Sequence, residues 1–184
     1  MLVLGINGSP RVGGNTEAML NEALKSAKAS GAEVKMIRLC DYKIEPCKGC
    51  MTCFKTGKCA IKDDGQTLYE EITQANGIIL ASPSYFQGVT AQMKTFIDRI
   101  GFLGLAREKK DFVGKVGGVV AVARRSGLSS TACDMIIFFT ALGVAIPSGG
   151  RVYGVGNEIG DVLKDHEGLE TAKLLGKSIV VSMA

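Results

Sequence analysis

Tryptophan is absent from this chain of 184 residues, and His166 is its only histidine. Metal sites and catalytic triads that depend on histidine are therefore nearly excluded. The formal net charge is only +4, and no block of lysine and arginine with interleaved aromatic residues occurs. Nucleic acid is consequently not an expected partner. His166 itself is expected to be exposed near a helix start, and no role is assigned to it.

Long hydrophobic segments are also missing. The longest apolar stretch, residues 135–147, is interrupted by Thr140 and Gly143 and falls short of the roughly 18 residues that a membrane span needs. The N-terminus has no basic region before its brief apolar run, so it does not resemble a signal peptide. We therefore expect a cytoplasmic protein with no membrane partner. In that compartment, clustered cysteines more often bind metal or act in catalysis than form disulfides.

The sequence does contain a regular alternation of short apolar runs and amphipathic segments. Strands are predicted over residues 2–6, 33–39, 77–81, 116–123 and 143–147. Helices are predicted over residues 17–30, 66–74, 93–103, 128–142 and 169–181. Such alternation indicates a parallel sheet covered on both faces, and right-handed crossovers favour the strand order 2-1-3-4-5. The prediction is an α/β, flavodoxin-like three-layer sandwich: one domain over residues 1–184, with a cysteine-rich insertion at about 40–62.

The segment after the first strand, residues 7–16, has the composition of a phosphate-binding loop. Glycines allow backbone N–H groups to approach an anion, Ser9 and Thr16 add hydroxyls, and Arg11 adds positive charge in front of a helix N-terminus. No Gly-Lys-Ser/Thr ends the loop and no G-x-G-x-x-G occurs in it, so a Walker loop and a dinucleotide fingerprint are both disfavoured. The alternative is a capped strand-to-helix turn without a ligand, with Asn15 or Thr16 as the cap.

A second loop, residues 82–90, follows the third strand and lies at the same end of the predicted sheet. Pro83 stiffens it, and Tyr85 and Phe86 can flank a flat ring. In doubly wound sheets, ligands bind at the carboxyl ends of the strands where the strand order reverses. A phosphate in the first loop and a planar heterocycle beside the second describe FMN. The alternative is an aromatic pair that fills the core beneath the next helix.

Four of the six cysteines fall within thirteen residues at the spacing C-x2-C-x2-C-x5-C: Cys47, Cys50, Cys53 and Cys59. Four thiolates in so short a segment suit a 4Fe–4S cluster, although the last gap is longer than in the bacterial ferredoxin run and no proline follows. A zinc site would more often split its ligands into two distant pairs, and disulfides are disfavoured by the compartment. Cys40 and Cys133 lie outside the run and are expected to be small core residues.

These features together resemble a known family. Residues 8–11, 14–16 and 82–90 look like the flavin loops of the NADPH-dependent FMN reductase-like flavoproteins. The cysteine run ahead of residues 61–64 is similar to that of the iron–sulfur flavoprotein branch of the same superfamily. The resemblance covers most of the chain. It implies a flavodoxin-like fold, non-covalent FMN, a 4Fe–4S cluster, and a homodimer or homotetramer with the flavin near a subunit interface.

The resemblance also implies roles for individual residues. The FMN phosphate would be held by Ser9, Arg11, Gly14, Asn15 and Thr16. The isoalloxazine ring would be lined by Pro83, Ser84, Tyr85, Phe86 and Gln87. The loop after the fourth strand is a third candidate flavin contact, because a cation or N–H near the ring stabilises the reduced flavin; its residues are Arg124, Ser126 and Gly127.

The expected function is therefore that of an FMN-dependent oxidoreductase or electron-transfer flavoprotein in which a 4Fe–4S cluster is coupled to FMN. Its partners would be a small electron carrier such as ferredoxin, NAD(P)H, or both, and Lys48, Lys55 and Lys58 are predicted to steer an acidic carrier. No side chain is nominated as a catalytic acid or base. Two alternatives stay open: an NAD(P)H-dependent FMN or quinone reductase without a cluster, and a non-catalytic redox or metal sensor.

Overall fold

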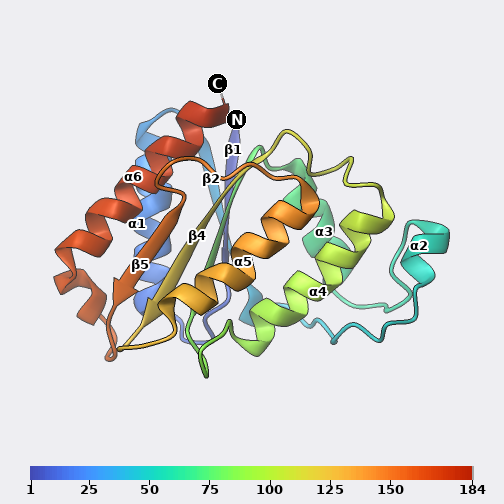
Figure 1. Cartoon of the computed structure of the whole chain (residues 1–184), viewed down its shortest axis with the longest axis horizontal. Helices are drawn as coiled ribbons and strands as arrows, with labels where there is room; N and C mark the ends of the chain where they lie inside the picture. Colours follow the sequence, from blue (N-terminus) through green and yellow to red (C-terminus); the bar gives the residue numbers. More distant parts are fainter. Residues whose placement is uncertain (184) are drawn as a thin grey trace.

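A computed structural model describes residues 1–183 and contains one sheet of parallel strands in the order β2-β1-β3-β4-β5. The strands are β1 (Leu2–Asn7), β2 (Glu33–Arg38), β3 (Gly77–Pro83), β4 (Val116–Ala123) and β5 (Arg151–Val155). This arrangement confirms the predicted flavodoxin-like order. The carboxyl ends of β4 and β5 lie together at the lower edge of Figure 1, where the loops that follow the strands meet.

Helices cover both faces of the sheet (Figure 1). They are α1 (Asn15–Ala29), α2 (Thr52–Thr56), α3 (Gly65–Gln74), α4 (Ala91–Ala106), α5 (Leu128–Leu142) and α6 (His166–Met183), with short 3-10 turns at Leu39–Asp41 and Asp161–Lys164. One core lies between the sheet and α1 and α6, and the other lies between the sheet and α3, α4 and α5. None of the helices in residues 1–183 has the length and apolar character needed to cross a bilayer.

The two cores follow from the pleat of the central strands. Successive side chains of a strand point to opposite faces, so Val3 of β1 enters the core beneath α1 and α6 while Leu4 enters the core beneath α3 to α5. In the same way, Val119 and Val120 of β4 serve opposite faces. Strands buried on both sides read as continuous apolar runs, whereas β2 alternates because it lies at the sheet edge, as the sequence indicated.

The predicted fifth strand is in the wrong place. Within residues 143–147 only Ala145 meets the sheet, through an isolated bridge to Val116. Pro147 has no backbone N–H to donate to a ladder, and its carbonyl instead accepts the Gly150 N–H at 2.9 Å in a turn. The chain therefore bends first, and β5 begins at Arg151.

The cysteine-rich segment follows β2 in the chain. Its short helix α2 packs outside α4, at the right of Figure 1. Phe54 of α2 meets Phe102 of α4 edge to face, with 6.4 Å between ring centroids. The apolar stretch of α5 contributes to both the core and the surface: Phe138 and Phe139 are buried and Ile137 is exposed.

Candidate functional site

The loop between β1 and α1 is folded by its own side chains into an anion-binding shape. Asn7 Oδ1 accepts the Ser9 N–H at 2.9 Å, and Ser9 Oγ accepts the Arg11 N–H at 3.2 Å, so the Ser9 hydroxyl retains its own proton for donation. Gly14, rather than Asn15 or Thr16, is the N-cap of α1, and no side chain caps the helix. The first amides of α1 therefore keep their N–H groups free of intrahelical partners, which favours an anion at this helix end.

Asn15 is used differently from the prediction. Its side-chain Nδ2 donates to the Glu158 carbonyl at 2.8 Å, and its Oδ1 accepts the Gly160 N–H at 2.9 Å. The amide thus joins the start of α1 to the loop that follows β5. Arg11 reaches the same loop, donating from Nη1 to the Asn157 carbonyl at 3.2 Å. The loop after β5, which the sequence analysis did not include, is therefore a fourth wall of the site.

A buried hydroxyl network joins the first loop to the second. Thr90, fully buried, donates from its hydroxyl to the Gly8 carbonyl at 2.7 Å and accepts the Met93 N–H at 3.2 Å as N-cap of α4. The Thr90 N–H donates in turn to Ser82 Oγ at 3.1 Å. Sequence reasoning gave Thr90 no role, although a threonine directly before an amphipathic helix is a recognisable N-cap signal.

The second loop is a tight hairpin that presents its aromatic residues to solvent. Tyr85 and Gly88 exchange backbone hydrogen bonds of 2.9 and 3.1 Å, and the turn residues Phe86 and Gln87 have φ angles of 48° and 71°. Both angles are in the left-handed region, as in a type I′ turn, and that conformation costs a non-glycine residue about 1–3 kcal/mol. Phe86 is fully exposed and Tyr85 about half exposed, so the pair does not fill the core.

The third loop, between β4 and α5, packs directly on this hairpin. Gln87 Nε2 donates to Ser126 Oγ at 3.3 Å, and the Ser130 hydroxyl donates to the Gln87 carbonyl. Gly127 has a φ of 88°, and a Cβ at this position would lie 2.1 Å from Ser84 Oγ and 3.0 Å from Gln87 Cα. Glycine is therefore required where the two loops approach one another.

The four loops enclose a cavity of about 170 Å³ at the carboxyl ends of the strands. Its walls include eight of the predicted flavin residues: Ser9, Arg11, Asn15, Thr16, Pro83, Ser84, Tyr85 and Arg124. Gly156, Asn157 and Ile159 join them from the loop after β5. Gln87, Ser126 and Gly127 line an adjacent hollow instead, Gly14 caps α1, and Phe86 points to solvent.

This cavity fits a flavin mononucleotide in its chemistry. Free helix amides and the Ser9 hydroxyl supply donors for a phosphate, and Arg11 and Arg124 supply positive charge on the same cavity. The Ser84 N–H is not available to a ligand, because it donates to the Val122 carbonyl at 2.8 Å. The half-exposed ring of Tyr85 offers a flat surface on the same cavity.

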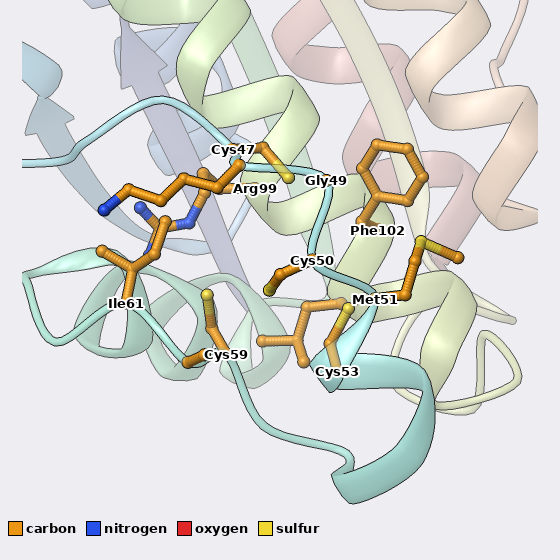
Figure 2. A pocket seen from close by; sticks show the side chains of 12 residues that line it. Cys47, Gly49, Cys50, Met51, Cys53, Cys59, Ile61, Arg99 and Phe102 are labelled. Atoms are coloured by element: carbon orange, nitrogen blue, oxygen red, sulfur yellow. The ribbon is translucent and has the colours of Figure 1, made fainter.

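A second pocket lies between the cysteine loop and α4, and Figure 2 shows Cys50 and Cys59 pointing toward one another across it. The cysteine residues that line it are Cys47, Cys50, Cys53 and Cys59. Their loop is shaped by left-handed residues, with φ angles of 63° at Gly49 and 56° at Met51. The pocket is closed on the α4 side by Arg99 and Phe102.

The four cysteines share one pocket without converging on one point. Among residues 1–183, no three Cys, His, Asp or Glu side chains lie close enough together to hold a metal ion. A 4Fe–4S core is wider than a single ion and is held by one thiolate at each corner. The donor set, four thiols around one pocket, fits such a core better than it fits zinc, which gathers its ligands around one centre.

The thiols differ in their surroundings. The Thr52 side chain and N–H lower the pKa of Cys50 by hydrogen bonding, whereas partial burial raises the pKa of Cys53. All six cysteines lie within residues 1–183 and are free, so no disulfide in this part of the chain ties up the four pocket thiols.

Both ends of the cysteine loop are clamped to each other and to α4. Asp63 accepts the Glu45 N–H at 2.8 Å and the Gly65 N–H at 2.9 Å. Its two oxygens also accept both terminal nitrogens of Arg99, each at 2.8 Å. The hydrogen bonds from Arg99 lower the pKa of Asp63 to about 2. Sequence reasoning gave neither Asp63 nor Arg99 a role at this loop.

Comparison with known proteins identifies the family of this chain. Residues 1–157 match the family model described as NADPH-dependent FMN reductase. An iron–sulfur flavoprotein of Methanocaldococcus jannaschii is 41% identical over 187 aligned residues, which cover 97% of this chain and 95% of that protein. The chain belongs to the iron–sulfur flavoprotein branch of the NADPH-dependent FMN reductase family. It is accordingly a flavin-dependent oxidoreductase.

Solved structures add support for the fold of this family member. RosB, solved with a bound riboflavin 5′-phosphate derivative, matches with a TM-score of 0.81 at 18% identity, covering 100% of this chain and 79% of that chain. A flavodoxin from the domain Archaea matches with a TM-score of 0.66 at 16% identity, covering 100% of this chain and 99% of that chain. At these identities the likeness establishes the fold alone.

Two cysteines of this flavoprotein lie where the sequence did not predict them. Cys40 and Cys133 are both exposed rather than core residues. At Cys40 the core position is taken by Leu39, which is 1% exposed. Cys133 follows Ala132, which is buried on the inner face of α5, and one residue further along a helix turns the side chain by about 100° toward solvent. His166 is exposed at the start of α6, as expected.

Proposed function

We propose that this chain binds FMN in the sheet-end cavity and a 4Fe–4S cluster in the cysteine pocket, and that it transfers electrons between them. The chain would act as one FMN-binding domain with a cysteine-rich insertion. The observation that carries the proposal is that the four cysteines of the C-x2-C-x2-C-x5-C run line one pocket on a flavodoxin-like scaffold. The names of the relatives support the same pair of cofactors.

The proposed flavin contacts follow from the cavity. Ser9, Arg11 and the first amides of α1 would hold the phosphate, and Thr16 would add its hydroxyl. Asn15 would act through the loop after β5 that its side chain anchors. Pro83, Ser84 and Tyr85 would line the ring, with Gln87, Ser126 and Gly127 beside them in the adjacent hollow.

When bound, FMN supplies chemistry in one- or two-electron steps and a 4Fe–4S cluster supplies one-electron chemistry. The chain's own residues would bind and orient the two cofactors and adjust their reduction potentials. Arg124 lies on the flavin cavity, where a positive charge favours the anionic reduced ring. Cys47, Cys50, Cys53 and Cys59 would supply thiolates, and the apolar ring of Phe102 would limit solvent access to the pocket.

The proposed partners are a small acidic electron carrier such as ferredoxin, NAD(P)H, or both. Lys48, Lys55 and Lys58 are all exposed around the cysteine pocket, where clustered positive charge raises the rate of encounter with an acidic protein. We also propose a homodimer or homotetramer, which the exposed apolar side chains of Phe102 and Ile137 support.

The experiment compares two single-thiol variants after anaerobic purification. Cys59→Ser should lose most of the iron and acid-labile sulfide, and the matched control Cys133→Ser, an exposed thiol outside the pocket, should retain both. Both variants should keep FMN, since the flavin cavity shares no residue with the cysteine pocket. Equal iron in the two variants, or none in the unmodified protein, would contradict the cluster. Stopped-flow mixing with NADH, NADPH and reduced ferredoxin would then identify the electron donor.

A further inference from the structure

Arg99 is a buried cation on α4 that faces the cysteine pocket. Its side chain is only 3% exposed, and it lines the pocket together with the four cysteines (Figure 2). Nη1 donates to Asp63 Oδ2 at 2.8 Å and to the Glu45 carbonyl at 2.6 Å, and Nη2 donates to Asp63 Oδ1 at 2.8 Å. The two terminal nitrogens of the guanidinium are thus used by the loop clamp.

The third guanidinium nitrogen of Arg99, Nε, differs from the two terminal nitrogens in its hydrogen bonding. Within the part of the chain that the structure describes, Nε is buried and has no hydrogen-bond partner. A buried donor without a partner costs about 1–3 kcal/mol, and more when it belongs to a charged group. Because more than nine in ten such groups are satisfied in native proteins, an orphaned one indicates a missing partner.

The missing partner has to be a hydrogen-bond acceptor, and a group bound in the pocket that Arg99 lines can supply one. Cys59 and Arg99 line the same pocket, together with Cys47, Cys50 and Cys53. The acceptors that belong in this pocket when it is loaded are thiolate and sulfide sulfurs.

We propose that Arg99 donates its Nε–H to a sulfur of the cluster held by the four cysteines, and so positions the cluster and raises its reduction potential. The inference rests on the proposed function, because it requires that cluster. Hydrogen bonds to the sulfurs are among the factors that set cluster potentials, and they favour the reduced, more negative state. Because the negative charge of Asp63 balances the positive charge of Arg99, the hydrogen bond from Nε is the main effect of Arg99 on the cluster potential.

A purely structural role for Arg99 makes different predictions. If the guanidinium only ties the loop to α4 through Asp63 and Glu45, its removal would change stability and cluster content but leave the potential of the remaining cluster unchanged. A lysine can still pair with Asp63 but has no Nε–H in the position of the guanidinium. Arg99→Lys therefore separates the hydrogen bond from the clamp.

The test is an EPR-monitored redox titration of anaerobically purified protein. Arg99→Lys and the charge-balanced double variant Arg99→Gln with Asp63→Asn should both shift the midpoint potential of the cluster to lower values. The matched control Lys94→Gln, an exposed cation on the same helix, should not shift it. Unchanged potentials in both Arg99 variants would overturn the inference while leaving the proposed function intact.

A second measurement uses the unmodified sequence and does not depend on the variants folding. Pulsed EPR of the reduced protein, grown with 15N-labelled arginine, should show a weak 15N coupling on the cluster signal. A cluster signal without that coupling would overturn the inference alone. A protein that contains no iron or sulfide would overturn the proposed function and the inference together, so the two failures are distinguishable.

Discussion

Substitution of Gly127 should weaken flavin binding. Gly127 ends the loop from β4 into α5, as the N-cap of that helix, with a φ of 88°. Gly114, between α4 and β4, has an almost identical φ of 87° but nothing within 4 Å of where a Cβ would lie. The two positions therefore have the same backbone conformation and differ in their surroundings. Comparing Gly127→Ala with Gly114→Ala isolates the close approach of the two flavin loops.

The expected change in unfolding free energy combines two opposing effects of the added Cβ. A left-handed conformation costs a residue with a Cβ about 1–2 kcal/mol, and the reduced freedom of alanine in the unfolded chain offsets about 0.4–1 kcal/mol. Both variants should therefore lose about 1 kcal/mol of unfolding free energy from the backbone alone. In Gly127→Ala the new Cβ also stands 2.1 Å from Ser84 Oγ and 3.0 Å from Gln87 Cα. The hydroxyl can rotate away, but the backbone of Gln87 has to move.

Displacing Gln87 moves the hairpin that flanks the flavin cavity. We expect Gly127→Ala to weaken FMN binding by roughly tenfold, which corresponds to about 1.4 kcal/mol, and Gly114→Ala to leave the dissociation constant within about a factor of two. The assay is quenching of FMN fluorescence on titration into flavin-free protein, with urea unfolding as the stability measurement. Equal dissociation constants for the two variants would refute the argument from close approach. An unchanged unfolding free energy of Gly114→Ala would refute the expected cost of the left-handed backbone conformation.

Three further predictions concern the clamp, the cap and the charged loop. The pKa of Asp63, about 2 in the folded chain, lies below the ordinary value of 3.8. Its ionised carboxylate therefore stabilises the fold above pH 4. About 2 kcal/mol of unfolding free energy should be lost as the pH falls from 4 to 2. Asp63→Asn should remove this dependence in urea unfolding series, and parallel curves would contradict it. Thr90→Val should cost about 2 kcal/mol by leaving the buried Gly8 carbonyl without its donor, whereas Thr90→Ser should cost less than half of that in the same assay. Changing Lys48, Lys55 and Lys58 to glutamate should slow reduction by ferredoxin at low salt and have little effect at high salt; stopped-flow rates that are unchanged at low salt would rule out steering.

Much of the fold was predictable because the buried strands carry their own signal. Residues 77–81 and 116–123 are continuous apolar runs, and β3 and β4 are indeed buried on both faces. The order of the strands followed from chirality and alternation alone. β5 was missed because it is short and has the burial pattern of an edge strand, with Arg151 and Val155 exposed, so a nearby apolar segment with more hydrophobic character was preferred.

The candidate site was predictable to the level of loops but not of side-chain partners. Residue types identified a phosphate loop, yet only the fold shows that the Asn15 side-chain amide is hydrogen-bonded to the loop after β5. Cys40 and Cys133 were assigned to the core from residue type, whereas their exposure depends on the turn of the helix at each position. The pairing of Asp63 with Arg99 spans 36 residues. A local sequence pattern cannot predict a contact at that separation.

Helix α4 explains how both sites coexist on one scaffold. Its N-cap, Thr90, is bound to the phosphate loop, and Arg99 faces the cysteine pocket. Nine residues at 1.5 Å each separate the two by about 14 Å along a rigid element, and they share no hydrogen-bond partner. Substitutions at such separations are usually additive. We therefore expect the sheet-end cavity to keep its shape whether or not the cysteine pocket holds a cluster.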